Sequence, residues 1–334
     1  MPYKSPFEPA LLRRGAVLGA IGDVSVPLHY GDPDREAGAL RTGAGLIDLS
    51  WRGVIDVTGR DRARFLHGMC TNDIKKLQPG QGCMAAVVNR QGKMVAEMIA
   101  HAAENAILLE MDRSNIVPTI EHLQKFLVAD DVALRPSDAA VLGLWGPRAQ
   151  GLLSVKDLPD FHFVIRDGVA VSRNRSLGVE GYHLIVPASK SAEADGILGH
   201  GVAPAGFEAH EALRVEFGFP RWGADMDATL LPMEAGLEPL AISYNKGCYI
   251  GQEVIQRVKT YSEPPRMLVQ LEVERAAPGD KILSGAEEIG AVTSAASSLA
   301  LGIVRKEFKS PGTELQVGGK PARVRALPWQ SRLG

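Results

Sequence analysis

The residues best suited to chemistry lie in one short stretch, residues 246–253, with the sequence KGCYIGQE. Apolar residues recur at helical spacing after it, so the sequence predicts a helix that begins near Gly251. A helix start favours negative charge, and the ammonium of Lys246 lies two residues from Cys248. Both features favour the thiolate form of a cysteine. Cys248 is therefore a candidate reactive group.

The same spacing also fits a simpler interpretation, a glycine-rich turn with a half-buried, unreactive thiol. Glu253 and Arg257 stand four residues apart, where a helix brings opposite charges together, so an ion pair is expected in either case. The two interpretations predict the same helix and differ in the environment of the sulfur.

The composition is that of an ordinary globular protein. The chain has 334 residues, 45% of them hydrophobic and 23% charged, which is enough for two or three domains. A formal net charge of −2 gives no support for binding nucleic acid or a membrane through bulk electrostatics. No apolar run is long enough to span a membrane. We expect a soluble protein of a reducing compartment, the cytoplasm.

The cysteines and histidines set limits on metal binding. The three cysteines, Cys70, Cys83 and Cys248, form no CxxC pair and cannot be a disulfide framework. They are also too few to hold an iron–sulfur cluster with four thiolates of one chain. The eight histidines show no recognisable zinc spacing, so no metal site is predicted.

Helices alternate with strands in the first part of the chain. A helix is expected after Asp61, and a second after Ser114 with Val117, Ile120, Leu123 and Leu127 facing a core. A hairpin turn is expected at 89–92. Strands are expected at 54–57, 84–88, 93–100, 106–111 and 132–134. This alternation predicts an α+β fold class, with a ferredoxin-like subdomain at about 53–135.

The second part of the chain contains more strands and ends in a turn-rich region. Strands are expected at 140–145, 164–172 and 181–186, and a helix at 208–217 is closed by Gly218. The pair Pro264-Pro265 marks a boundary, because neither residue can donate to a strand ladder. The dense turns beyond it predict a small antiparallel β-barrel. We therefore divide the chain into domains at 1–262 and 263–334.

The stretch KGCYIGQE, with an arginine four residues after its glutamate, resembles the signature of the YgfZ/IBA57 family of folate-binding proteins. These are relatives of the glycine cleavage T-protein, an aminomethyltransferase, and are associated with iron–sulfur cluster assembly and repair. Further blocks resemble this superfamily in the same order: 48–50, 59–61, 71–73, 89–92, 213–218, 231–237 and 290–294. The resemblance implies a three-part T-protein-like cloverleaf, with a folate-binding region at 1–262, a C-terminal barrel, and folate in a central channel.

The resemblance also implies which residues contact tetrahydrofolate. Arg214 matches the pterin-contacting arginine of the family; the alternative is a salt bridge on its helix with Glu211 or Glu208. Asn72 and Asp73 are candidate ligand contacts, although such residues in loops are more often turn formers. Two further residues, Tyr249 and Gln252, would shape the pocket.

The sequence departs from the aminomethyltransferase pattern at three positions. Those enzymes carry adjacent aspartates where this chain has Ala96-Glu97, so the carboxylate of Glu97 is displaced by one methylene. A misplacement of about 1 Å can cost about a hundredfold in rate. Met84 replaces an aromatic residue. His183 replaces a pterin-binding glutamate. Glu180 is a nearby substitute, and the equal alternative is that Glu180 is a satisfied surface carboxylate.

The leading hypothesis is a tetrahydrofolate-binding accessory protein in iron–sulfur cluster assembly or repair, with Cys248 as reactive group. Its partners would be a folate derivative and iron–sulfur enzymes or assembly proteins. The alternative is a tetrahydrofolate-dependent aminomethyl- or methyltransferase that uses Glu97. A third possibility is a non-catalytic scaffold whose folate site is vestigial.

Overall fold

The computed structural model describes residues 2–191 and 202–332. Its α-helices are α1 (Glu8–Arg13), α2 (Pro33–Thr42), α3 (Arg62–Met69), α4 (Ile116–Gln124), α5 (Ala149–Leu153), α7 (Phe207–Phe217), α8 (Glu238–Ala241) and α9 (Gln252–Tyr261). Short 3-10 helices lie at Ile74–Lys76, Arg113–Asn115, Ala188–Lys190, Lys306–Phe308 and Gln330–Arg332. Within these described ranges, no helix has the length and apolar character needed to cross a membrane.

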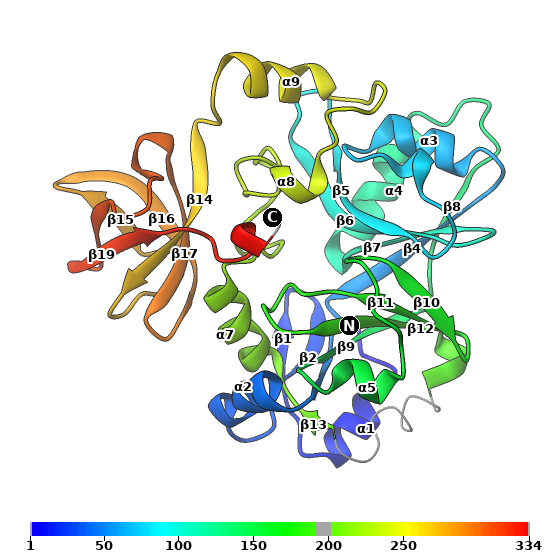
Figure 1. The fold of residues 1–334 in the computed structure, drawn as a ribbon, viewed down its shortest axis with the longest axis horizontal. Helices are drawn as coiled ribbons and strands as arrows, with labels where there is room; N and C mark the ends of the chain where they lie inside the picture. The colour runs from blue at the N-terminus through cyan, green and yellow to red at the C-terminus, as the bar shows by residue number, and fades with distance from the viewer. Residues whose placement is uncertain (1, 192–201, 333–334) are drawn as a thin grey trace. The chain divides into compact units, whose positions relative to one another are not determined.

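The strands fall into a hairpin, two open sheets and a barrel (Figure 1). They are β1 (Val17–Ile21), β2 (Val24–His29), β3 (Gly45–Asp48), β4 (Arg52–Thr58), β5 (Gly82–Val88), β6 (Met94–Ala102), β7 (Ile107–Asp112), β8 (Ala133–Pro136), β9 (Ala140–Trp145), β10 (Phe163–Arg166), β11 (Val169–Arg173), β12 (Gly181–Val186), β13 (Ala203–Pro204), β14 (Arg266–Val273), β15 (Lys281–Ser284), β16 (Glu287–Ala296), β17 (Leu299–Arg305), β18 (Glu314–Val317) and β19 (Lys320–Arg325).

The chain divides into two compact units, neither of which is a continuous piece of sequence. The first comprises Met1–His67, Asp73–Ala85 and Glu97–His210, and the second comprises Gly68–Asn72, Ala86–Ala96 and Glu211–Gly334. Strands β5 and β6 each contribute residues to both units. Because each unit combines several segments of the sequence, this grouping does not test a division at a single point. The domain boundary at 262/263 therefore stays a prediction.

Two open sheets account for most strands before residue 205. One has the order β10-β11-β12-β9-β3-β13 and the other β5-β6-β7-β4-β8. The pairs formed by β4, β6 and β7 are antiparallel, and β3 pairs antiparallel with β9. Strands β9 and β12 are buried along their whole length and contribute Leu142, Leu144 and Leu184 to a core cluster. Helices α3 and α4 connect strands of the five-stranded sheet, as the predicted α+β class requires.

Helix α4 buries only part of the predicted face. Leu123 is buried as predicted, but Val117 is 58% exposed, and Ile116 and Thr119 are buried as well. The reason lies at its start, where Ser114 is not the helix cap: its N–H and hydroxyl both donate to the carboxylate of Asp112. The α-helix therefore begins only at Ile116, and its apolar stripe is counted from there.

The C-terminal strands close into the small antiparallel barrel that the turns predicted. The order is β14-β17-β16-β15-β18-β19, and β14 also pairs with β19, which closes the ring (Figure 1, yellow to red). Burial alternates along β18, where Leu315 and Val317 face the core and Glu314 and Gln316 face out. Alternation of this kind is what lets one face of each strand fill a small barrel.

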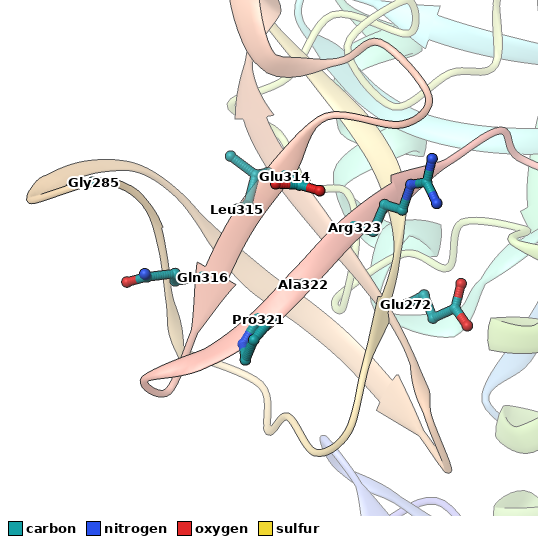
Figure 2. Close-up of a pocket in the computed structure, with 8 residues that line it drawn as sticks. All are labelled: Glu272, Gly285, Glu314, Leu315, Gln316, Pro321, Ala322 and Arg323. Carbon is teal, nitrogen blue, oxygen red and sulfur yellow. The ribbon is translucent and has the colours of Figure 1, made fainter.

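A pocket on this barrel is lined by charged and apolar residues (Figure 2). Arg323 stands directly across from Glu272 on β14 and from Glu314 on β18. The pocket is lined by Glu272, Gly285, Glu314, Leu315, Gln316, Pro321, Ala322 and Arg323. None of these residues was predicted to bind folate or to react, so the candidate site lies elsewhere.

Candidate functional site

One face of the five-stranded sheet carries an unusual set of charged side chains in the first unit. Val54 and Ile99 both stand opposite Glu110 in the strand pairing. Because side chains alternate along a strand, Arg52 and Glu97 lie on the same face as Glu110, each two residues along its own strand. Strands β4, β7 and β6 therefore bring an arginine and two glutamates together.

Arg52 joins the two carboxylates. Its Nη1 donates to Oε1 of Glu97 at 2.9 Å, its Nε donates to the carboxylate of Glu110, and its Nη2 reaches the backbone oxygen of Glu110 at 3.3 Å. Glu110 also meets two histidines: Nδ1 of His183 on β12 lies 2.8 Å from Oε1, and Nε2 of His101 lies 3.5 Å from Oε2. The result is a network that links Glu97 to His183 through Arg52 and Glu110.

The charges in this network stabilise one another. Burial by itself raises the pKa of the Glu110 carboxyl, but His183 and Arg52 outweigh it and hold that pKa well below its usual range. Burial likewise opposes the charge of Arg52, but Glu97 and Glu110 outweigh it and raise the pKa of the guanidinium. Glu110 and Arg52 are therefore both charged at neutral pH.

The two carboxylate oxygens of Glu97 differ in their hydrogen bonding. Its side chain is only 3% exposed, and Oε2 is buried without a hydrogen-bond partner among the residues that the structure describes. Leaving a buried acceptor unsatisfied costs about 1–3 kcal/mol, and more for a charged group. An N–H donor of a bound molecule would satisfy it. The catalytic role that the resemblance implied for Glu97 stays a prediction.

Aromatic rings lie beside this network. The ring of His183 meets Trp145 edge to face at 5.5 Å, and Trp145 meets His210 at 5.8 Å. His210 in turn lies 5.2 Å from Trp51, the neighbour of Arg52 in sequence. The rings thus form a chain of contacts that starts at His183, a member of the network.

The second unit gathers the KGCYIGQE motif and three other motif segments. Lys246 is buried, and its Nζ donates to the backbone oxygens of Cys70 at 2.5 Å and Asn72 at 2.9 Å. The same ammonium lies 4.9 Å from the centroid of the Tyr249 ring. Lys246 therefore holds the loop that contains Asn72. Activation of Cys248 by its charge stays a prediction.

The turn at Asn89–Gly92 packs against the glycine of the motif. The side chain of Asn89 accepts from the N–H groups of Gln91 and Lys93, which confirms the predicted hairpin turn. Gly251 has φ +80°, and a Cβ there would lie 2.3 Å from the backbone oxygen of Asn89. Only glycine fits such a position. A further motif segment joins through Glu234, whose carboxylate lies 3.4 Å from Nζ of Lys93.

Cys248 lies exposed just before helix α9. It is a free cysteine, and its thiol has no hydrogen bond within the described part of the chain. The helix begins at Gln252, with Gly251 as N-cap and Glu253 in its first turn, as predicted. The expected ion pair between Glu253 and Arg257 is wrong: both side chains are exposed, and the described residues contain no such pair. Exposed pairs of this kind gain little.

Tyr249 and Gln252 occupy different environments within the motif. Tyr249 is buried, its hydroxyl has no hydrogen-bond partner among the described residues, and burial raises its pKa to about 12. Gln252 is half-buried at the first position of α9, and its N–H donates to the backbone oxygen of Tyr249. The pocket-shaping role of both residues stays a prediction.

Arg214 is engaged in internal contacts, and its predicted pterin contact stays a prediction. It is 2% exposed, and all five of its N–H donors are engaged. Nε and Nη2 donate to Glu211, Nη1 to Asp225 and to the backbone oxygen of Phe219, and Nη2 also to Ser294. A guanidinium has no sixth donor to offer a ligand. The salt bridge to Glu211 was the predicted alternative.

The remaining predicted contacts lie in the first unit, outside the network. Asp73 is paired with His67 at 3.1 Å and Lys76 at 2.7 Å. Glu180 is paired with Arg173 at 2.9 Å, and Met84 is buried on β5. Of the residues predicted for this unit, the structure therefore joins only Glu97 and His183.

Two members of the network, Arg52 and Glu110, were not predicted from the sequence. Each is a charged residue among apolar neighbours on a strand, with Glu110 between Leu109 and Met111. Such residues are buried only when paired, which is a usable signal. Among the described residues, no group of three or more His, Cys, Asp or Glu side chains is arranged to hold a metal ion.

Two family models match the chain. Residues 7–246 match the GCVT N-terminal domain, and residues 266–332 match the C-terminal β-barrel domain of CAF17. The first match covers well over half of the chain. The second coincides with the closed barrel, which begins at Arg266.

Curated relatives and a solved structure agree with these matches. An aminomethyltransferase of Geobacillus kaustophilus (strain HTA426) is 31% identical, over 98% of this chain and 97% of its own. One of Listeria monocytogenes serotype 4a (strain HCC23) is 28% identical, over 97% and 95%. The glycine cleavage system aminomethyltransferase T of Bartonella henselae superimposes with a TM-score of 0.91 at 24% identity, over 98% of both chains. At that identity the likeness shows the fold, and it is the fold expected from the sequence.

Proposed function

Since the chain belongs to the GCVT family, the folate-binding T-protein superfamily, we propose that it binds a tetrahydrofolate with Glu97 as an acceptor. The observation that supports this role is the buried, unpartnered Oε2 of Glu97, fixed in place through Oε1. His183 belongs to the same network, where it holds Glu110. In this proposal, the folate-binding region spans 1–262 and the barrel spans 263–334.

Within that family, we propose an accessory role in iron–sulfur cluster assembly or repair, with Cys248 as the reactive group. Cysteine is among the most buried residue types, yet Cys248 is exposed and lies three residues before the N-cap of α9. An accessible thiol beside a helix start is suited to exchange or transient metal contact. Its partners would be iron–sulfur enzymes or assembly proteins, and its location the cytoplasm, where thiols stay reduced.

The second candidate function is tetrahydrofolate-dependent aminomethyl transfer. It is favoured by the names of the relatives and by the Glu97 carboxylate, which is held in one orientation by Arg52. A positioned carboxylate is the kind of group that general acid–base catalysis requires. In this alternative, Cys248 has no part in the reaction.

Two substitutions separate the candidates. Cys248→Ser and Glu97→Gln would each be tested for rescue of an iron–sulfur enzyme in a strain that lacks this protein, and for one-carbon transfer in vitro. The accessory role predicts that Cys248→Ser abolishes rescue while tetrahydrofolate affinity stays unchanged. The transferase role predicts measurable transfer by the wild type and a loss of about a hundredfold or more in Glu97→Gln. Full rescue by Cys248→Ser would contradict the accessory role.

A further inference from the structure

The contacts of Arg52 fix the orientation of its guanidinium as well as balancing its charge. The guanidinium is tied to β7 at two points, the carboxylate and the backbone oxygen of Glu110, and it presents its remaining Nη1 to Glu97. Glu110 is itself fixed by His183 from the six-stranded sheet and by His101 from β6. Arg52 is therefore held by Glu110 on one side and donates one hydrogen bond to Glu97 on the other.

We propose that Arg52 is a positioning residue for the folate site: anchored on Glu110, it holds Glu97 by Oε1 so that Oε2 faces a bound tetrahydrofolate. This inference rests on the proposed folate-binding role of Glu97. It adds that the site depends on a side chain that does not itself touch the ligand.

The hydrogen bond from Arg52 restricts the Glu97 side chain more than packing alone would. A free glutamate side chain has three rotatable bonds, and fixing one oxygen by a charged hydrogen bond removes most of that freedom. The groups that face Glu97 and its partner from the surrounding strands are Arg52 on β4, Glu110 on β7, His101 on β6 and His183 on β12. Among these, only Arg52 contributes a hydrogen bond to Glu97.

The sign of the pH effect follows from the charge. Removing the guanidinium leaves the Glu97 carboxylate buried beside Glu110 with no adjacent cation, which favours its neutral, protonated form. A protonated carboxyl is a poorer acceptor for a folate N–H. Affinity for tetrahydrofolate should therefore begin to fall at a higher pH in Arg52→Met than in the wild type. A neighbouring cation typically shifts such a midpoint by about 1–3 pH units.

The experiment measures tetrahydrofolate affinity by calorimetry across acidic to neutral pH, in the full chain. The variants are Arg52→Met, Arg52→Lys, and Arg52→Met combined with Glu97→Gln. The control is Arg221→Met, because Arg221 is 16% exposed against 14% for Arg52 and likewise pairs with a glutamate, at 3.1 Å. Thermal melts establish that each variant is folded.

We expect the affinity midpoint of Arg52→Met to move upward by about 1–3 pH units, and the double variant to lose this titration. Arg52→Lys keeps the positive charge but loses the planar set of guanidinium donors. The pH midpoint of its tetrahydrofolate affinity should therefore match that of the wild type, while the affinity itself should drop about tenfold. The control should follow the wild type. A profile of Arg52→Met that coincides with the wild type, or a shift that persists in the double variant, would overturn the inference.

Failure of the inference is distinguishable from failure of the proposed function. If the wild type does not bind tetrahydrofolate at any pH, folate binding is wrong, but the coupling of Arg52 to Glu97 remains testable without ligand. The pH dependence of urea unfolding then takes the place of affinity, and the extra titration should appear in Arg52→Met and vanish in the double variant. If Arg52→Met does not fold, Arg52→Lys serves as the test variant. An affinity for tetrahydrofolate equal to that of the wild type would then contradict a positioning role for Arg52.

Discussion

At the scale of single residues, Glu97 has one oxygen that the fold uses and one that it does not. Oε1 pairs with Arg52, whereas Oε2 is buried without a partner among the described residues, which costs about 1–3 kcal/mol. Energetically unfavourable groups of this kind are typical of functional sites. Arg214 shows the opposite pattern, because every donor it has is used within the second unit.

The saturation of Arg214 leads to a prediction about stability. Arg214→Met would leave Glu211 and Asp225 without their shared cation, and removal of one partner from a buried ion pair costs about 3–5 kcal/mol. Urea unfolding should report a loss of that size, while the affinity of the folded protein for tetrahydrofolate should change little.

The matched comparison for this prediction is Arg257→Met. Arg257 is exposed on α9 and has no ion pair in the described ranges, so its free energy of unfolding should change by less than about 0.5 kcal/mol. A drop of tenfold or more in affinity for Arg214→Met, with unfolding unaffected, would restore the pterin-contacting role that the resemblance implied.

At the scale of elements, the second unit depends on a glycine that lets two segments meet. Gly251 both caps α9 and touches the turn at Asn89, and its φ of +80° is one that side chains disfavour. The KGCYIGQE motif and the turn at 89–92 are therefore one packing unit, although more than 150 residues separate them in sequence.

This packing predicts the effect of Gly251→Ala. The left-handed conformation alone costs alanine about 1–2 kcal/mol, and the clash with the backbone oxygen of Asn89 at 2.3 Å adds to it. Gly223→Ala is the matched control, since its φ is +76° but a Cβ there meets nothing within 4 Å. Urea unfolding should show a larger loss for Gly251→Ala. Equal losses would mean that the contact with Asn89 is unimportant.

Elements were easier to predict from sequence than the faces they bury. The strands at 140–145 and 181–186 were predicted with the observed bounds, because apolar runs between turn residues mark them clearly. The face of α4 was predicted only in part, because Leu123 is buried but Val117 is exposed behind the 3-10 turn that precedes the helix. Arg52 and Glu110 were missed for a related reason: sequence shows that a charge lies on a strand, but only the pairing register shows what it meets.

At the scale of the whole molecule, the family and the fold were within reach of the sequence, and the candidate site was so only in part: Glu97 and His183 were predicted, whereas Arg52 and Glu110 were not. Motif blocks in the right order identify a superfamily even at about 30% identity, and the turn-rich end predicted the closed barrel. Site residues such as Arg214 carry the family's motif and yet are fully engaged in internal bonds here. Fold thus transfers between relatives more safely than the role of a single side chain.

The most direct test of the central claim is a crystal structure of the full chain with tetrahydrofolate bound. The account predicts a nitrogen of the ligand within hydrogen-bond distance, about 3 Å, of Oε2 of Glu97, with Arg52 still on Oε1. A ligand bound elsewhere, with Oε2 of Glu97 still unpartnered, would contradict it.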